Sequence, residues 1–169
     1  MRVSREYGFT LIEMVVVLIL IGILAVTFVE RSSSKGALTF AAQAQQLASD
    51  IRYVQTLSMT RGERYCLNLT STGYSMTMTN CSTSIGVEHP AGATFPIALD
   101  GVALSWSNLS NDLVTFTGKD KPYTDATATA ANALASDAVI TLGGDGGPMY
   151  VCISPETGRV FVDTNTDCL

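Results

Sequence analysis

The chain of 169 residues has a single histidine, His89, no proline before Pro90 and no cysteine before Cys66. One histidine leaves few ways to build a Ser-His-Asp catalytic site. No two cysteines have the Cys-x-x-Cys spacing that zinc sites commonly use, so we expect no metal site. Without an early proline, no residue before Gly62 forces a helix to break. The composition therefore predicts neither an enzyme nor a cofactor-binding protein.

Basic residues are also scarce, with 10 Lys and Arg against 15 Asp and Glu and a formal net charge of −5. This acidic balance argues against broad nucleic-acid binding, because contacts to phosphates need Lys or Arg. Two small groups of cations, Arg61 with Arg64 and Lys119 with Lys121, leave DNA open as an alternative partner. Ordinary solvated charge is the simpler interpretation of both groups.

One long apolar run contains almost no charge. It extends from Phe9 to Val29, and Glu13 is its only charged residue. A helix of that length spans about 30 Å, the thickness of a bilayer core. Residues 1–8 carry two arginines, and positive charge before an apolar segment keeps that end in the cytoplasm. We therefore predict a single-pass helix over residues 9–29, with a cytoplasmic N-terminus and the remaining chain on the other side.

The apolar run opens with the sequence Gly-Phe-Thr-Leu-Ile-Glu at residues 8–13. This sequence resembles the class III signal of type IV pilins and type II secretion pseudopilins. The resemblance implies that a prepilin peptidase removes residues 1–8 by cutting between Gly8 and Phe9, and that it methylates the new amine of Phe9. A plain single-span anchor or an uncleaved signal is the alternative interpretation.

Glu13 is costly inside an apolar segment unless a cation accompanies it. Cleavage would create such a cation, the amine of Phe9. Glu13 lies four residues from Phe9 in its own helix, so a pair within one chain is possible. The family resemblance implies instead a pair between neighbouring subunits of a filament, which would set their register as a buried polar group does in coiled coils. The alternative is that Glu13 reaches the membrane interface by itself.

Four cysteines, Cys66, Cys81, Cys152 and Cys168, lie beyond the apolar run. An even number of cysteines in an exported domain predicts two disulfides. Three pairings are possible. We favour Cys66–Cys81 and Cys152–Cys168, because each closes a loop of about 15 residues, which contributes about 3 kcal/mol by loss of chain entropy in the unfolded state.

The segment of residues 30–61 predicts an amphipathic continuation of the same helix. Its apolar residues recur at alternating steps of four and three, while polar residues, Asp50 among them, fall mostly elsewhere. One face should therefore pack on the rest of the chain. The spaced residues are Phe40, Ala44, Leu47, Ile51, Val54 and Ser58.

Residues 62–169 contain short alternating runs separated by turn signals, which predict antiparallel strands. The predicted strands are residues 64–69 and 74–79, which form a hairpin, then 113–117, 138–142, 149–153 and 159–162. Residues 82–99 predict a loop, residues 143–148 a turn and residues 124–135 a loop or a short helix. The expected fold class is α+β, with a long N-terminal helix packed on an antiparallel β-sheet in a β-rich periplasmic or extracellular domain.

The C-terminal tail copies part of a calcium-binding loop with Asp163, Asn165 and Asp167. Cys168 stands where an EF-hand needs Gly, and no bidentate Glu follows. The tail is therefore not an EF-hand, although a calcium site completed by other residues stays open.

A second resemblance concerns the segments 47–56 and 61–64 and the Gly-Arg-Val sequence at residues 158–160. They resemble the GspH/FimT group of minor pilins and pseudopilins. The resemblance implies a minor pilin, a structural subunit whose partners are other pilins, prepilin peptidase, the inner-membrane assembly platform and, before assembly, membrane lipid. The alternatives are a minor pseudopilin of a type II secretion system and a tip module for DNA uptake or adhesion.

Overall fold

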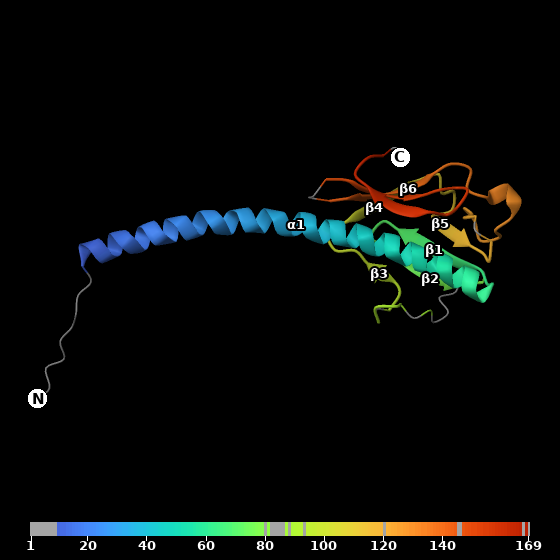
Figure 1. Cartoon of the computed structure of the whole chain (residues 1–169), viewed down its shortest axis with the longest axis horizontal. Helices are drawn as coiled ribbons and strands as arrows, with labels where there is room; N and C mark the ends of the chain where they lie inside the picture. The colour runs from blue at the N-terminus through green and yellow to red at the C-terminus, as the bar shows by residue number, and fades with distance from the viewer. Residues whose placement is uncertain are drawn as a thin grey trace, which may run out of the picture. The chain divides into compact units, whose positions relative to one another are not determined.

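A computed structural model shows the fold of the chain (Figure 1). The structure describes residues 10–79, 81, 87, 89–92, 94–119, 121–144, 147–166 and 168, with the backbone alone for residues 24–39. The chain divides into two compact units, Met1–Gly36 and Ala37–Leu169.

Helix α1 spans Leu11–Arg61. Glu13 in its first turn and Arg61 in its last suit the positive and negative ends of the helix dipole. The helix ends where Gly62 adopts a left-handed φ of 67° and its N–H donates to the carbonyl of Ser58 at 2.9 Å. Glycine adopts that conformation without the steric cost that a side chain carries. No helix among the described residues combines the length and the hydropathy that a membrane span needs.

The second unit contains the amphipathic part of α1. The predicted stripe is buried there, and Leu47, Ile51 and Val54 are completely buried. On the neighbouring face Arg52 donates through Nε and Nη2 to the carbonyl of Val160, at 3.1 and 2.8 Å. Apolar packing of the stripe and the hydrogen bonds of Arg52 on the neighbouring face together fix this part of the helix.

The first of two sheets has the strand order β3-β2-β1-β5 and is antiparallel throughout. Its strands are β1 (Tyr65–Thr70), β2 (Gly73–Met78), β3 (Ile97–Ala98) and β5 (Leu113–Phe116). The register places Leu67 opposite both Met76 and Val114. A side chain at Gly73 would collide with the carbonyl oxygen of Ile97, so glycine is what lets β3 approach β2. The predicted first hairpin is confirmed, whereas β3 lies inside the segment predicted to be a loop.

The second sheet is also antiparallel and has the order β4-β6-β7-β8. Its strands are β4 (Ala103–Ser107), β6 (Ala138–Gly143), β7 (Met149–Ile153) and β8 (Val160–Asp163). The hairpin predicted around Gly158 is confirmed as β7 and β8. Strand β4 was not predicted, because its run Ala-Leu-Ser-Trp-Ser contains only two bulky apolar residues.

One hydrophobic core joins the α1 stripe to both sheets. Figure 1 shows both sheets beside the C-terminal part of α1 within this unit. The largest completely buried side chains come from all three, and burying each such side chain stabilises the fold by about 1.5–3 kcal/mol. They include Leu47, Tyr65, Phe116, Ile140 and Ile153. The predicted α+β class, a long helix packed on antiparallel β-structure, is confirmed, but in the described part of the chain the single predicted sheet is two sheets of four strands each.

Candidate functional site

The first turn of α1 carries the residue that the sequence singled out, Glu13. The hydroxyl oxygen of Thr10 accepts a hydrogen bond from the Glu13 N–H at 3.3 Å. The Thr10 carbonyl also accepts from the N–H groups of Glu13 and Met14, at 3.1 and 3.3 Å. Thr10 is therefore the N-cap of the helix, and its spacing to Glu13 is that of a capping box. The sequence analysis missed the role of Thr10, although Thr followed by Glu three residues later is a recognisable signal.

The Glu13 carboxylate has no hydrogen bond or ion pair to another described residue. Gly8 and Phe9, the predicted cleavage position, lie outside the described residues. The pairing of Glu13 with the Phe9 amine therefore stays a prediction.

The side chains before and after Glu13 in this part of α1 are apolar and exposed on every side of the helix. Leu11 is 83% exposed, Leu18 68% and Ile23 59%, and the residues between them are similar. A helix that is apolar all round is typically covered by protein or by lipid. This segment is therefore a contact surface rather than a helix suited to water.

All four predicted cysteines form disulfides in the structure. Cys66 is bonded to Cys81 and Cys152 to Cys168, with Cα–Cα distances of 5.3 and 5.7 Å. The first bond attaches the chain after β2 to β1. The second attaches the C-terminal tail to β7. Both bonds lie in the unit Ala37–Leu169.

A buried polar network joins α1, β2 and the loop before β3. Asp50 is 3% exposed and accepts from the Tyr74 hydroxyl at 2.6 Å. The second Asp50 oxygen lies 2.9 Å from Nε2 of His89, which is 6% exposed. The N–H of Ala91 donates to Nδ1 of His89 at 3.1 Å, so the proton of the neutral ring sits on Nε2 and is donated to Asp50. Asp50 is thus buried although it lies outside the apolar stripe of α1.

This Asp–His pair cannot act as part of a Ser-His-Asp triad in the described arrangement. In a triad the ring nitrogen opposite the aspartate accepts the proton of the nucleophile. Here that nitrogen, Nδ1, is occupied by the Ala91 N–H. Burial, followed by the hydrogen bond to Asp50, raises the pKa of Tyr74 far above its usual range. The network therefore holds three elements together as a structural unit.

The two cation groups proposed as alternative DNA contacts are largely engaged in structural contacts. Arg64 Nη1 donates to the carbonyl of Ala126 at 2.6 Å. Arg61 Nη1 donates to the Tyr65 hydroxyl at 3.2 Å. Lys121 pairs with Glu156 at 2.6 Å on an exposed surface, and Lys119 is the remaining member. These contacts weaken the case for a continuous phosphate-binding surface.

The described part of the tail that resembles a calcium loop forms a local turn. The Asp163 carboxylate accepts from the N–H groups of Thr164 and Asn165, at 2.6 and 3.0 Å. Asp167 lies outside the described residues. Within the part of the chain that the structure describes, no group of three or more His, Cys, Asp or Glu side chains is placed to hold a metal ion.

Comparisons with known proteins agree with the motif and with the fold. Residues 3–29 match the prokaryotic N-terminal methylation motif. Two solved structures of the type IV minor pilin FimU from Pseudomonas aeruginosa are similar to this chain. The P21 crystal form has 13% sequence identity and a TM-score of 0.50, over 84% of this chain and 99% of that chain. The P65 form has 12% identity and a TM-score of 0.49, over 76% of this chain and 99% of that chain.

No curated protein sequence matches the chain. At 13% identity the P21 structure shows a shared fold and not a shared role. The chain therefore combines the prokaryotic N-terminal methylation motif with a pilin-like fold.

Proposed function

We propose that the chain is a minor pilin-like structural subunit, processed by prepilin peptidase and incorporated into, or initiating, a type IV pilus. The match of residues 3–29 to the methylation motif carries this proposal, because it includes Gly8, Phe9 and the whole apolar run to Val29. The pilin-like fold beyond the motif supports it.

The same apolar surface would serve two states. Before assembly, residues 9–29 would anchor the chain in the inner membrane, with the disulfide-bonded unit in the periplasm. After removal from the membrane, the exposed side chains from Leu11 to Ile23 would be covered by neighbouring subunits. Since lipid and a bundle of apolar helices are both dry surroundings, exchange between them costs little hydrophobic free energy.

Glu13 would then set the axial register between neighbouring subunits. The Glu13 carboxylate bonds no other described residue, so it is available for a partner outside its own turn. A cleaved Phe9 would offer an amine of opposite charge. Pairing across subunits would select one axial register, because a misplaced neighbour leaves a carboxylate unpaired in an apolar core.

The mass of the N-terminal peptide tests the proposal. The full chain is expressed with an active prepilin peptidase and, as control, with an inactive one. We expect a peptide that starts at N-methylated Phe9 with the active peptidase only. A peptide that starts at Met1 or after Thr27 in both samples would contradict the proposal.

A second measurement tests the role of Glu13. Glu13→Ala should remain in the membrane fraction but enter sheared filaments at a clearly reduced level, whereas Glu63→Ala, at an exposed position after α1, should assemble normally. Normal incorporation of Glu13→Ala would remove the register role.

Recovery of the chain in sheared pili favours the pilus. A deletion that blocks protein secretion and leaves pili unchanged would favour the alternative, a pseudopilin of a type II secretion system.

A further inference from the structure

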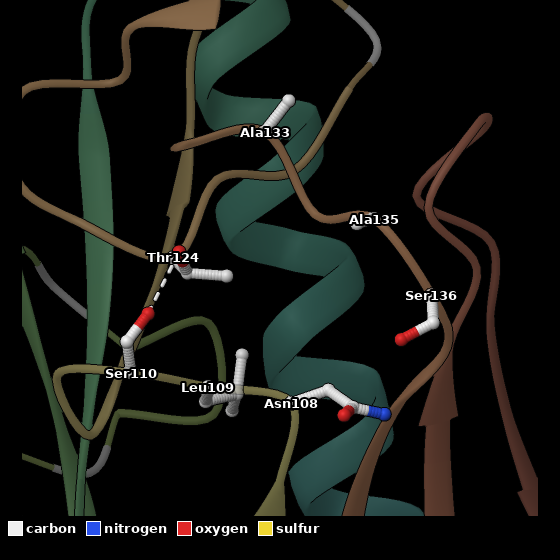
Figure 2. Close-up of a pocket in the computed structure, with 7 residues that line it drawn as sticks. All are labelled: Asn108, Leu109, Ser110, Thr124, Ala133, Ala135 and Ser136. Atoms are coloured by element: carbon white, nitrogen blue, oxygen red, sulfur yellow. Dashed lines mark hydrogen bonds between the residues drawn. The ribbon is translucent and has the colours of Figure 1, made fainter. Parts of the chain in front are cut away.

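A pocket of about 440 Å³ lies between the turn after β4 and the segment 124–136 (Figure 2). Asn108, Leu109 and Ser110 form one wall. Thr124 forms the other wall together with Ala133, Ala135 and Ser136, which follow the short 3-10 helix η1 (Ala130–Asn132). Figure 2 shows the Ser136 hydroxyl directed between the two walls. The volume falls in the range of small-molecule sites, about 300–1,000 Å³.

The two walls are tied to each other by hydrogen bonds. Asn108 Nδ2 donates to the carbonyl of Asp137 at 2.7 Å. The Ser110 hydroxyl donates to the Thr124 hydroxyl at 3.2 Å, the dashed line in Figure 2. Asn111 Nδ2 donates to the Thr124 carbonyl at 3.3 Å. The pocket is therefore present before any ligand arrives, which lowers the entropic cost of binding.

Two polar groups of the lining make no hydrogen bond within the described part of the chain. They are the amide oxygen Oδ1 of Asn108, which can only accept, and the hydroxyl of Ser136, which can donate and accept. Leu109, Ala133 and Ala135 add methyl groups between them. The lining contains no charged and no aromatic side chain.

This chemistry excludes several classes of ligand. An anion such as a phosphate would find no cation in the lining. An extended peptide would need a free strand edge, but the Thr124 N–H donates to the Asn132 carbonyl at 2.9 Å and the Leu134 N–H to the Pro122 carbonyl at 3.0 Å. A purely apolar ligand would leave Asn108 Oδ1 and the Ser136 hydroxyl without water or partner. A neutral ligand with hydroxyls on an apolar ring avoids all three problems: it carries no charge, it needs no free strand edge, and its hydroxyls can bond Asn108 Oδ1 and the Ser136 hydroxyl.

We propose that this pocket binds a neutral saccharide unit, with sugar hydroxyls bonded to Asn108 Oδ1 and the Ser136 hydroxyl. The C–H face of the ring would lie on Leu109, Ala133 and Ala135. Because no aromatic side chain stacks on the ring and only two polar groups are free, the dissociation constant should be on the order of millimolar. The proposal is independent of the filament role, since every lining residue lies in the unit Ala37–Leu169.

Saturation-transfer NMR on the full chain tests this site. The protein is held in a detergent without a sugar headgroup, so that the detergent does not compete. The probes are glucose, galactose and N-acetylglucosamine, each at millimolar concentration, with glucuronate as the charged comparison. We expect saturation transfer to at least one neutral sugar and at least tenfold weaker binding of glucuronate.

Matched variants locate the binding. Ser136→Phe fills the pocket from an exposed position and should abolish the transfer, while Ser105→Phe, on the exposed side of β4, should leave it unchanged. Ser136→Ala removes only the hydroxyl and should weaken binding several-fold. The proposal is overturned if no neutral sugar shows transfer, if glucuronate binds as well as the neutral sugars, or if Ser136→Phe binds as the unaltered chain does. Binding of a neutral tripeptide in place of any sugar would also overturn it.

Discussion

The two described parts of helix α1 differ in whether their apolar side chains are exposed or buried. From Leu11 to Ile23 apolar side chains are exposed on every side, whereas from Phe40 to Arg61 they form one buried stripe. Backbone geometry is the same in both parts, so the difference comes from the side-chain pattern alone. A stripe with helical spacing is satisfied by the sheets of its own chain. An all-round apolar surface can be satisfied only by lipid or by other molecules.

The largest difference in the free energy of unfolding should come from making the same substitution, leucine to alanine, in each of the two parts. Leu47→Ala removes a completely buried side chain and should lower the free energy of unfolding by about 2–5 kcal/mol. Leu18→Ala, at a position that is 68% exposed, should leave it unchanged. Chemical denaturation of the full chain measures both. Equal losses in the two variants would show that the two parts do not differ as described.

The disulfides should have the next largest effect and act only on the second unit. Replacing Cys152 and Cys168 together by serine should lower the free energy of unfolding by about 3 kcal/mol, because the tail regains its freedom in the unfolded state. Peptide mapping under non-reducing conditions checks the pairing first. Mapping that links Cys66 to Cys152 would contradict it.

The buried network makes a pH-dependent prediction. The pKa of Tyr74 is raised in the folded state by burial and by Asp50, so its contribution is fully present below the unfolded-state pKa of about 10 and is lost as the pH rises above it. Tyr74→Phe should cost about 1 kcal/mol at neutral pH and should flatten the alkaline loss of stability. Denaturation between pH 8 and pH 11 measures it, with Tyr150→Phe as a control. If the free energy of unfolding falls with pH equally in Tyr74→Phe and in the unaltered chain, Tyr74 is not the source of the alkaline loss of stability.

The smallest effect should be confined to the start of α1. Thr10→Ala removes the cap and should destabilise the first turn by about 1 kcal/mol without changing the unfolding of the second unit. Amide exchange at Glu13 and Met14 measures it, and Thr10→Ser, which keeps the hydroxyl, should restore protection. Unchanged exchange in Thr10→Ala would show that the hydroxyl does not cap the helix.

Much of the fold was predictable where a local pattern decides it. The stripe from Phe40 to Val54 has the period of a helix, and the two hairpins have alternating strands around turn residues. Strand β3 was not predictable, because its two residues pair with β2 only through the close approach allowed at Gly73. Strand β4 was missed because its five residues contain only two bulky apolar side chains, so its local pattern is weak.

The candidate sites divide in the same way. The motif around Gly8 and Glu13 is contiguous, so it could be recognised without a structure. The Asp50–Tyr74–His89 network could not, because its members are separated by 24 and 39 residues from Asp50. Their separate patterns predicted a solvent-facing helix residue and a loop histidine. Only burial of all three together turns them into one hydrogen-bonded unit.

The sequence by itself determined the apolar run, its single carboxylate and the amphipathic continuation of the helix, because these are properties of neighbouring residues along one periodic backbone. Only the tertiary structure decided that Asp50 and His89 are buried together, that Arg64 binds a loop carbonyl and that a neutral pocket opens beside Ser136. Each of these depends on segments that are distant in the chain packing against each other, and a local sequence pattern does not predict such contacts.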